Sequence, residues 1–137
     1  MKEKSFRDPS VLHIAIANPG HAPYGKAAVA AMRNLGVYED IKGKLAYGED
    51  VSQTLIYVQQ KSADIGIVAL SLALAPTVRN TGRYWEIPLE SYPRIEQGGI
   101  ILRSSKNLKV AEAFRSYLVS ESGMGVLKRY GFFLPGT

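Results

Sequence analysis

The segment VLHIAIANPGHAPYGKAAVAAMRNLG, residues 11–36, joins an apolar run, a turn and an amphipathic stretch. Its first part, Val11–Ala17, is short, apolar and rich in β-branched residues, which favours a buried strand over a helix. The turn that follows holds two prolines and two glycines. Beyond the turn, apolar side chains recur at the spacing of one helix face, and Gly36 is placed to end that helix. The face consists of Ala28, Ala31, Met32 and Leu35.

The same order of elements continues along the chain. Lys44–Gly48 predicts a second short strand, and residues 49–60 predict a second helix with Asp50 as its N-cap. Three apolar residues form the expected inner face of this helix: Val51, Leu55 and Val58. Ala63–Leu70, again apolar, predicts a third strand. This β-α-β-α-β order favours an α/β fold, a doubly wound and mostly parallel sheet with helices on both faces.

The rest of the sequence predicts shorter elements. Residues 70–83 are expected to form a short helix and a loop, and residues 83–88 and 97–105 one strand each. A helix is expected around three apolar residues, Ala111, Phe114 and Leu118, and a shorter helix over residues 123–130.

The composition excludes several classes of protein. The 137 residues include 17 basic and 12 acidic side chains, a formal net charge of +5, but the basic residues are spread along the chain. A nucleic-acid partner is therefore not expected. The absence of cysteine excludes disulfides and thiolate chemistry. No apolar run is long enough for a membrane span, and the first ten residues lack the apolar core of a signal peptide, so neither is expected in this chain.

The turn before the first helix has features of an anion site. In open α/β sheets, ligands bind outside the carboxyl ends of the strands, where helices begin. Pro23 suits the first turn of a helix, and Gly25 is expected to let a ligand approach the backbone. The amides of Tyr24, Gly25 and Lys26 would then point outward at the positive end of the helix dipole. The second helix start, residues 50–52, is expected to offer further amides at the same edge.

An alternative stays open, because most turns between a strand and a helix carry Gly and Pro for turn geometry alone. His21 is either polar surface or a ligand, and His13 is expected to be a hydrogen-bonded core residue. No third ligand accompanies the two histidines, and no Ser-His-Asp set, phosphate loop or facing carboxylate pair is evident. We therefore expect neither an enzyme, nor a metal site, nor a cofactor.

Two short motifs, HAPYG at residues 21–25 and GEDV at residues 48–51, lie within a longer resemblance to a known family. From about residue 6 to residue 135, the sequence resembles the periplasmic molybdate/tungstate-binding proteins of ABC importers. The resemblance implies the type II periplasmic-binding-protein fold, in which two α/β lobes close on a tetrahedral oxyanion. It also implies a periplasmic location and a membrane permease as partner.

The resemblance further implies which residues contact the oxyanion. In the family, the second lobe supplies two backbone amides, at positions that correspond to Tyr24 and Val51 in this sequence. A tyrosine hydroxyl that some members add corresponds to Ala69, so that side-chain contact is not expected. Molybdate and tungstate are both compatible with such a site, since backbone amides recognise charge and size, in which the two ions differ little.

By the same resemblance, residues 1–97 correspond to the oxyanion-binding second lobe. Residues 98–137 correspond to a hinge strand and to C-terminal helices that pack on a first lobe, which has no counterpart in this sequence. We therefore expect a fragment with half of a binding site, and a homo-oligomer formed through the uncovered helix face. An alternative function is the effector-binding domain of a LysR-type transcription regulator, which has the same fold and senses a small anion.

Overall fold

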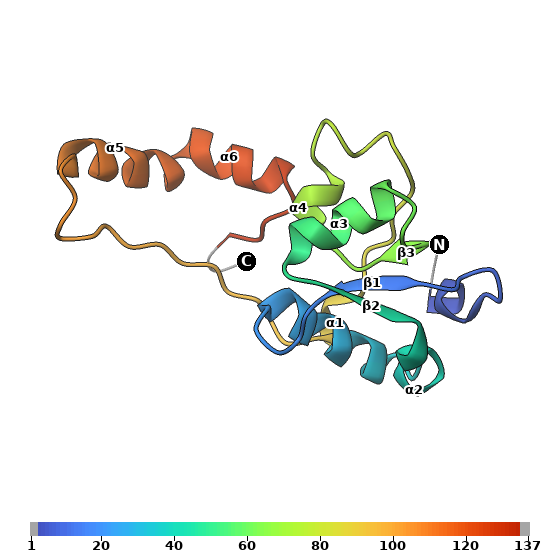
Figure 1. Ribbon diagram of the computed structural model, residues 1–137. Coiled ribbons are helices and arrows are strands. Elements are labelled where there is room, and N and C mark those ends of the chain that lie inside the picture. The colour runs from blue at the N-terminus through green and yellow to red at the C-terminus, as the bar shows by residue number, and fades with distance from the viewer. Residues whose placement is uncertain (1–2, 135–137) are drawn as a thin grey trace. The chain divides into compact units, whose positions relative to one another are not determined.

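The computed structural model describes residues 3–134 (Figure 1). The chain forms two compact units, Met1–Ile95 and Glu96–Thr137. The first unit contains a β-sheet with helices, and the second contains two helices.

A three-stranded parallel sheet forms the centre of the first unit. Its strands are β1 (Ile14–Ala17), β2 (Leu45–Gly48) and β3 (Ile65–Gly66), in the order β2-β1-β3. At the carboxyl ends of the two longer strands, Ala17 pairs with Gly48. All four residues of β1 are buried, as expected for an apolar central strand that is covered on both faces.

Two helices cover the sheet. Figure 1 shows α1 (Pro23–Asn34) on one face of the sheet and α3 (Val51–Gln59) on the other. The predicted α/β class, with a parallel sheet flanked by helices, is thereby confirmed.

The predicted inner face of α1 is confirmed. Ala28, Ala31 and Met32 are buried, and Met32 packs in the same core cluster as Ile16 of β1. Complete burial of a side chain such as Met32 stabilises the fold by about 1.5–3 kcal/mol. Gly36 follows the helix with φ of 68°, a conformation that glycine adopts without steric cost, and the helix ends as predicted.

The inner face of α3 differs from the prediction. Its fully buried residue is Thr54, whose hydroxyl donates to the carbonyl oxygen of Asp50 at 2.9 Å. Because this bond satisfies the hydroxyl, a threonine can occupy the core position. Half-buried positions are occupied by the three residues predicted for this face, Val51, Leu55 and Val58.

Short elements complete the first unit. They are the 3-10 helices η1 (Glu3–Arg7), η2 (Lys42–Lys44) and η3 (Leu89–Ser91), and the helices α2 (Tyr38–Ile41) and α4 (Leu70–Ala73). Arg7 joins two of these parts, since its guanidinium donates to the carboxylate of Asp40 at 2.7 Å and to the carbonyl oxygen of Gly36 at 2.6 Å.

Two predicted strands are wrong. In the described part of the chain, residues 83–88 and 97–105 belong to no strand, and the hinge strand expected after residue 97 is therefore not formed. The predicted third strand is shorter than expected and pairs only at Ile65–Gly66. A strand requires a neighbour that pairs with its backbone groups, and an apolar run such as residues 97–102 does not provide one. Ile100 accordingly has 85% of its surface exposed.

The second unit contains α5 (Leu108–Leu118) and α6 (Glu121–Arg129), which pack against each other. The Ser120 hydroxyl caps α6 by accepting the amide of Gly123 at 3.2 Å, so α6 begins two residues before the predicted start. On α5, Ala111 and Leu118 are half-buried, whereas Phe114 is 61% exposed.

Candidate anion-binding site

The carboxyl ends of β1 and β2 form one edge of the sheet. β1 leads into α1 and β2 leads into α3, and the two helices lie on opposite faces (Figure 1). The connections therefore diverge from neighbouring strands, the arrangement that opens a ligand-binding crevice in doubly wound folds. Because α1 and α3 both begin at this edge, the predicted site residues Tyr24 and Val51 lie at the same edge of the sheet.

The loop after β1 is held in shape by Asn18. Its amide donates to the carbonyl oxygen of Gly48 at 2.8 Å, which extends the β1–β2 pairing by one bond. Its side-chain oxygen accepts the amide of Gly20 at 2.8 Å, and its carbonyl oxygen accepts the amide of Ala22 at 2.9 Å. The loop is thus an Asx turn followed by a tight backbone turn, which leads directly into α1.

The start of α1 confirms the position predicted for Pro23, corrects the prediction for Lys26, and shows a packing role of Gly25 that was not predicted. Pro23 occupies the first position of the helix, where its missing amide hydrogen costs nothing. The amide of Lys26 does not point outward, because it donates to the carbonyl oxygen of Ala22 at 3.1 Å. Gly25 is buried, and a Cβ at this position would overlap the carbonyl oxygen of Ala17. The packing of α1 on β1 therefore requires glycine there, whether or not a ligand approaches.

The start of α3 is capped as predicted. The Asp50 carboxylate accepts the amide of Gln53 at 2.8 Å, and the Gln53 side chain accepts the amide of Glu49 at 2.7 Å. This pair resembles a capping box, except that the Gln53 side chain accepts the amide of the residue before the N-cap and not that of Asp50 itself. Within the described residues, the amides of Val51 and Ser52 donate to no protein acceptor. These amides lie in the first turn of α3, at the positive end of the helix dipole.

A side chain connects the two loops of this edge. His21, from the loop after β1, places Nε2 at 2.9 Å from the carbonyl oxygen of Glu49, which precedes α3. The Glu49 carboxylate lies farther from the same nitrogen, at 3.6 Å. Two interpretations of His21 were open, polar surface and ligand. In the structure, His21 is an exposed residue whose imidazole has a specific backbone partner.

Ala69 and Tyr24 complete the set of predicted site residues. Ala69 follows β3 and is buried at the N-cap position of α4, where it carries no hydroxyl group. The Tyr24 side chain belongs to a group of aromatic and acidic residues: burial first, and then Tyr24 and Glu86, raise the pKa of Tyr92. Tyr92 is half-buried, so its phenol remains neutral up to a higher pH than an exposed tyrosine.

His13 does not lie in the core, contrary to the prediction. It is exposed and precedes β1 at the amino edge of the sheet, opposite to the candidate site. Asp64 organises this edge, since Oδ2 accepts the amides of His13 at 2.9 Å and Leu12 at 2.8 Å. The His13 amide, and then the Leu12 amide, hold the pKa of Asp64 below its ordinary value.

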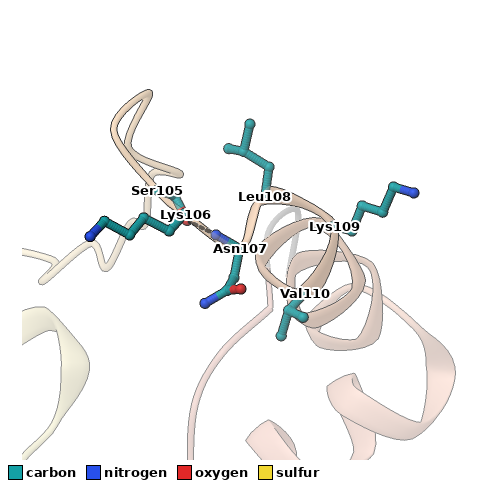
Figure 2. Close-up of a pocket in the computed structure, with 6 residues that line it drawn as sticks. All are labelled: Ser105, Lys106, Asn107, Leu108, Lys109 and Val110. Carbon is teal, nitrogen blue, oxygen red and sulfur yellow. Dashed lines mark hydrogen bonds between the residues drawn. The ribbon is translucent and has the colours of Figure 1, made fainter.

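Other parts of the described chain offer weaker arrangements for a ligand. Between residues 3 and 134, no group of three or more His, Cys, Asp or Glu side chains is placed to hold a metal ion. A hollow at the start of α5 is lined by residues 105–110 (Figure 2). Figure 2 shows that Lys106 and Lys109 extend in different directions, so their ammonium groups do not converge on one point.

Sequence analysis missed two residues that shape the candidate site, Asn18 and Gln53, and one contact, that of His21 with Glu49. Asn18 and Gln53 had readable signals, because an Asn before Pro-Gly is typical of an Asx turn and the spacing from Asp50 to Gln53 is that of a capping box. No local sequence pattern predicts the contact of His21 with Glu49, because the two residues are 28 positions apart.

The fold and this edge define an α/β ligand-binding lobe. The chain belongs to a family of binding proteins, since the profile described as "Bacterial extracellular solute-binding protein" matches residues 2–133. This membership confirms the expectation of a binding protein rather than an enzyme.

Several relatives match over most of this chain. The molybdate-binding protein ModA of Azotobacter vinelandii is 35% identical over 134 residues, which cover 98% of this chain and 51% of the relative. ModA of Rhodobacter capsulatus is 32% identical over 120 residues, 88% of this chain and 46% of the relative. The putative ABC transporter substrate-binding lipoprotein YvgL of Bacillus subtilis is 31% identical, over 87% of this chain and 45% of the relative. The chain thus spans about half the length of these relatives.

A solved structure shows the same similarity. The periplasmic molybdate-binding protein of Azotobacter vinelandii superposes with a TM-score of 0.86 at 28% identity, over 96% of this chain and 58% of that chain. These matches do not favour the alternative of a LysR-type effector domain. In the described part of the chain, no helix combines the length and the apolar character that crossing a membrane requires.

Proposed function

We propose that this chain is the anion-binding lobe of a molybdate- or tungstate-binding protein that serves an ABC importer. The observation that carries the proposal is the pair of helix starts at one sheet edge, where the amides of Val51 and Ser52 donate to no acceptor among residues 3–134. The names of the most similar relatives support the choice of oxyanion and transporter. By the same likeness, the protein acts in the periplasm and delivers its anion to a membrane permease.

In the proposed site, main-chain groups bind the anion. The amides of Tyr24 and Val51 donate to two of its oxygens, and the dipoles of α1 and α3 add to the attraction. Asp50 brings a negative charge close to this point, but its carboxylate is bonded to the amide of Gln53 and completes the helix cap. Pro23 has no amide hydrogen, so it occupies the first position of α1 without needing a hydrogen-bond acceptor. Gly25 has no Cβ, so the start of the helix can pack against β1. Ala69 contributes no donor side chain.

One lobe surrounds only part of a tetrahedral anion. In the proposed complete protein, a second lobe would supply donors to the remaining oxygens and exclude water from them. The chain spans about half the length of these relatives, and the proposed contacts all come from the starts of α1 and α3, which belong to one α/β unit. We therefore assign this chain half of the oxyanion shell.

The direct test is a titration of the chain with molybdate, tungstate, sulfate and phosphate, followed by amide chemical shifts in NMR spectra. The proposal expects molybdate and tungstate to shift the amides of Tyr24 and Val51 more than other amides. Shifts confined to residues 105–110, or no shifts at millimolar molybdate, would refute the proposed site.

The second unit supports a further proposal about assembly. Three large apolar side chains of α5 recur at the spacing of one helix face and are more than two-fifths exposed: Val110, Phe114 and Tyr117. We propose that a second copy of this chain covers this face in a two-fold dimer, since an exposed apolar helix face favours association.

A further inference from the structure

We propose that His21 is a positioning residue of the anion site: its imidazole clasps the loop after β1 to the loop after β2 and so aligns the starts of α1 and α3. This inference depends on the proposed function in one respect, namely that the starts of α1 and α3 bind the anion. The clasp itself follows from the contact between His21 and Glu49.

The contact has a defined direction. A carbonyl oxygen only accepts hydrogen bonds, so Nε2 of His21 carries the hydrogen and donates it to Glu49. At 2.9 Å the distance is that of a well-formed hydrogen bond. The two residues are 28 positions apart, and each belongs to a connection that leads into one of the two helices.

Both ends of the clasp are themselves held. The amide of His21 donates to the carbonyl oxygen of Asn18 at 3.3 Å, within the turn that Asn18 organises. The amide of Glu49 donates to the Gln53 side chain at 2.7 Å. Glu49 is therefore fixed through its amide by α3 and through its carbonyl by His21. The bonded carbonyl is one peptide group away from the amide of Val51, so its orientation influences where that donor points.

The hydrogen bond between His21 and Glu49 is exposed, so its effect on the positions of the loops can be tested without unfolding the protein. The side chain of His21 is 54% exposed, and that of Glu49 is 81% exposed. An exposed hydrogen bond contributes little to global stability. Removal of the imidazole should therefore leave the fold intact while the two loops lose their connection. Preorganised donors bind more tightly than donors that must be ordered on binding.

Three variants isolate this role. His21→Ala removes the donor. His21→Gln restores an N–H donor that lies the same number of bonds from Cβ as Nε2 does. His13→Ala is the matched control, because His13 is the other histidine of the chain, is exposed, and lies at the opposite edge of the sheet. Thermal unfolding of each variant establishes that it is folded.

The first measurement needs no ligand. In NMR spectra of the free chain, His21→Ala should shift the amides of Asp50 and Val51, across the sheet edge from the mutation. His21→Gln should shift them less, and His13→Ala should leave them unchanged. If His21→Ala leaves both amides in place, the clasp does not exist in solution and the inference is overturned.

The second measurement is an NMR titration with sodium molybdate. His21→Ala should weaken binding about three- to tenfold, the worth of one hydrogen bond, and His21→Gln should recover most of that loss. If His21→Ala shifts the loop amides but binds molybdate like wild type, the contact exists and the positioning role is overturned. If wild type binds no molybdate, the proposed function fails, and the ligand-free amide shifts still decide whether the clasp exists.

Discussion

Gly25 and Ala17 are in direct contact, so that any Cβ at position 25 would overlap the Ala17 carbonyl oxygen. We expect Gly25→Ala to push the start of α1 away from β1 and to destabilise the first unit by about 3 kcal/mol or more, as overpacking against backbone does. The measurement is the free energy of unfolding in denaturant. Gly43→Ala is the control, because nothing lies within 4 Å of a Cβ at that position. Equal stability of the two variants would show that α1 does not pack on β1 in this way.

Val51→Pro should remove one anion donor without unfolding α3. Val51 is the first residue of the helix, where proline is tolerated, and Asp50 already has the extended backbone (φ −144°, ψ −179°) that a following proline requires. We expect a loss of about 1.5–3 kcal/mol in molybdate binding, the worth of a hydrogen bond to a charged group, or roughly tenfold to a hundredfold. Binding is measured by calorimetry or NMR titration. Val51→Ala, which keeps the amide, should bind like wild type, and equal binding by both variants would place the site elsewhere.

Asp64 should make the stability of the first unit depend on acid. Its pKa is lowered in the folded state, so the carboxylate stabilises the fold above its ordinary value of 3.8, and this stabilisation is lost as the pH falls through the lower folded value. Asp64→Asn keeps an oxygen for the Leu12 and His13 amides but removes the charge. The variant should therefore be less stable than wild type at neutral pH. As the pH falls below 3.8, the variant should lose less stability than wild type, because it has no carboxylate to protonate. Parallel curves of unfolding free energy against pH would contradict this.

The exposed face of α5 should hold two copies of the chain together. We expect light scattering at tens of micromolar to report a dimer, and Phe114→Glu to shift it toward monomer, because a charge would be buried in an apolar interface. Lys109→Glu, an exposed change on the same helix outside the apolar set, is the control. A strict monomer of the wild-type chain would contradict the proposed dimer.

The chain alone should bind molybdate weakly. If a single lobe lacks about three charge-assisted hydrogen bonds of the complete shell, each worth roughly 1.5–3 kcal/mol, affinity falls by on the order of a thousandfold or more relative to a two-lobed protein. Titration of the monomeric chain measures this affinity. A submicromolar dissociation constant would show that the chain holds further donors, and would contradict the half-site proposal.

Local features of this protein could be predicted because their physical causes lie within a few residues. The burial of β1 follows from a short run without polar side chains, apart from His13 before its start. The inner face of α1 follows from helical spacing, its end from Gly36, and the cap of α3 from Asp50. The sequence by itself thus determined the order of strand and helix, and with it the edge at which the helices begin.

Only the tertiary structure decided the features that depend on a distant partner. Residues 97–105 are apolar enough for a strand, but pairing needs a neighbouring strand, and the described residues offer none there. Thr54 is buried because α3 turns its satisfied hydroxyl toward the sheet, and Gly25 is required because Ala17 lies beneath it. The contact of His21 with Glu49 forms only because the pairing of β1 with β2 brings the two loops together. Composition and periodicity carry no information on such contacts, because each joins residues that chain folding alone makes neighbours.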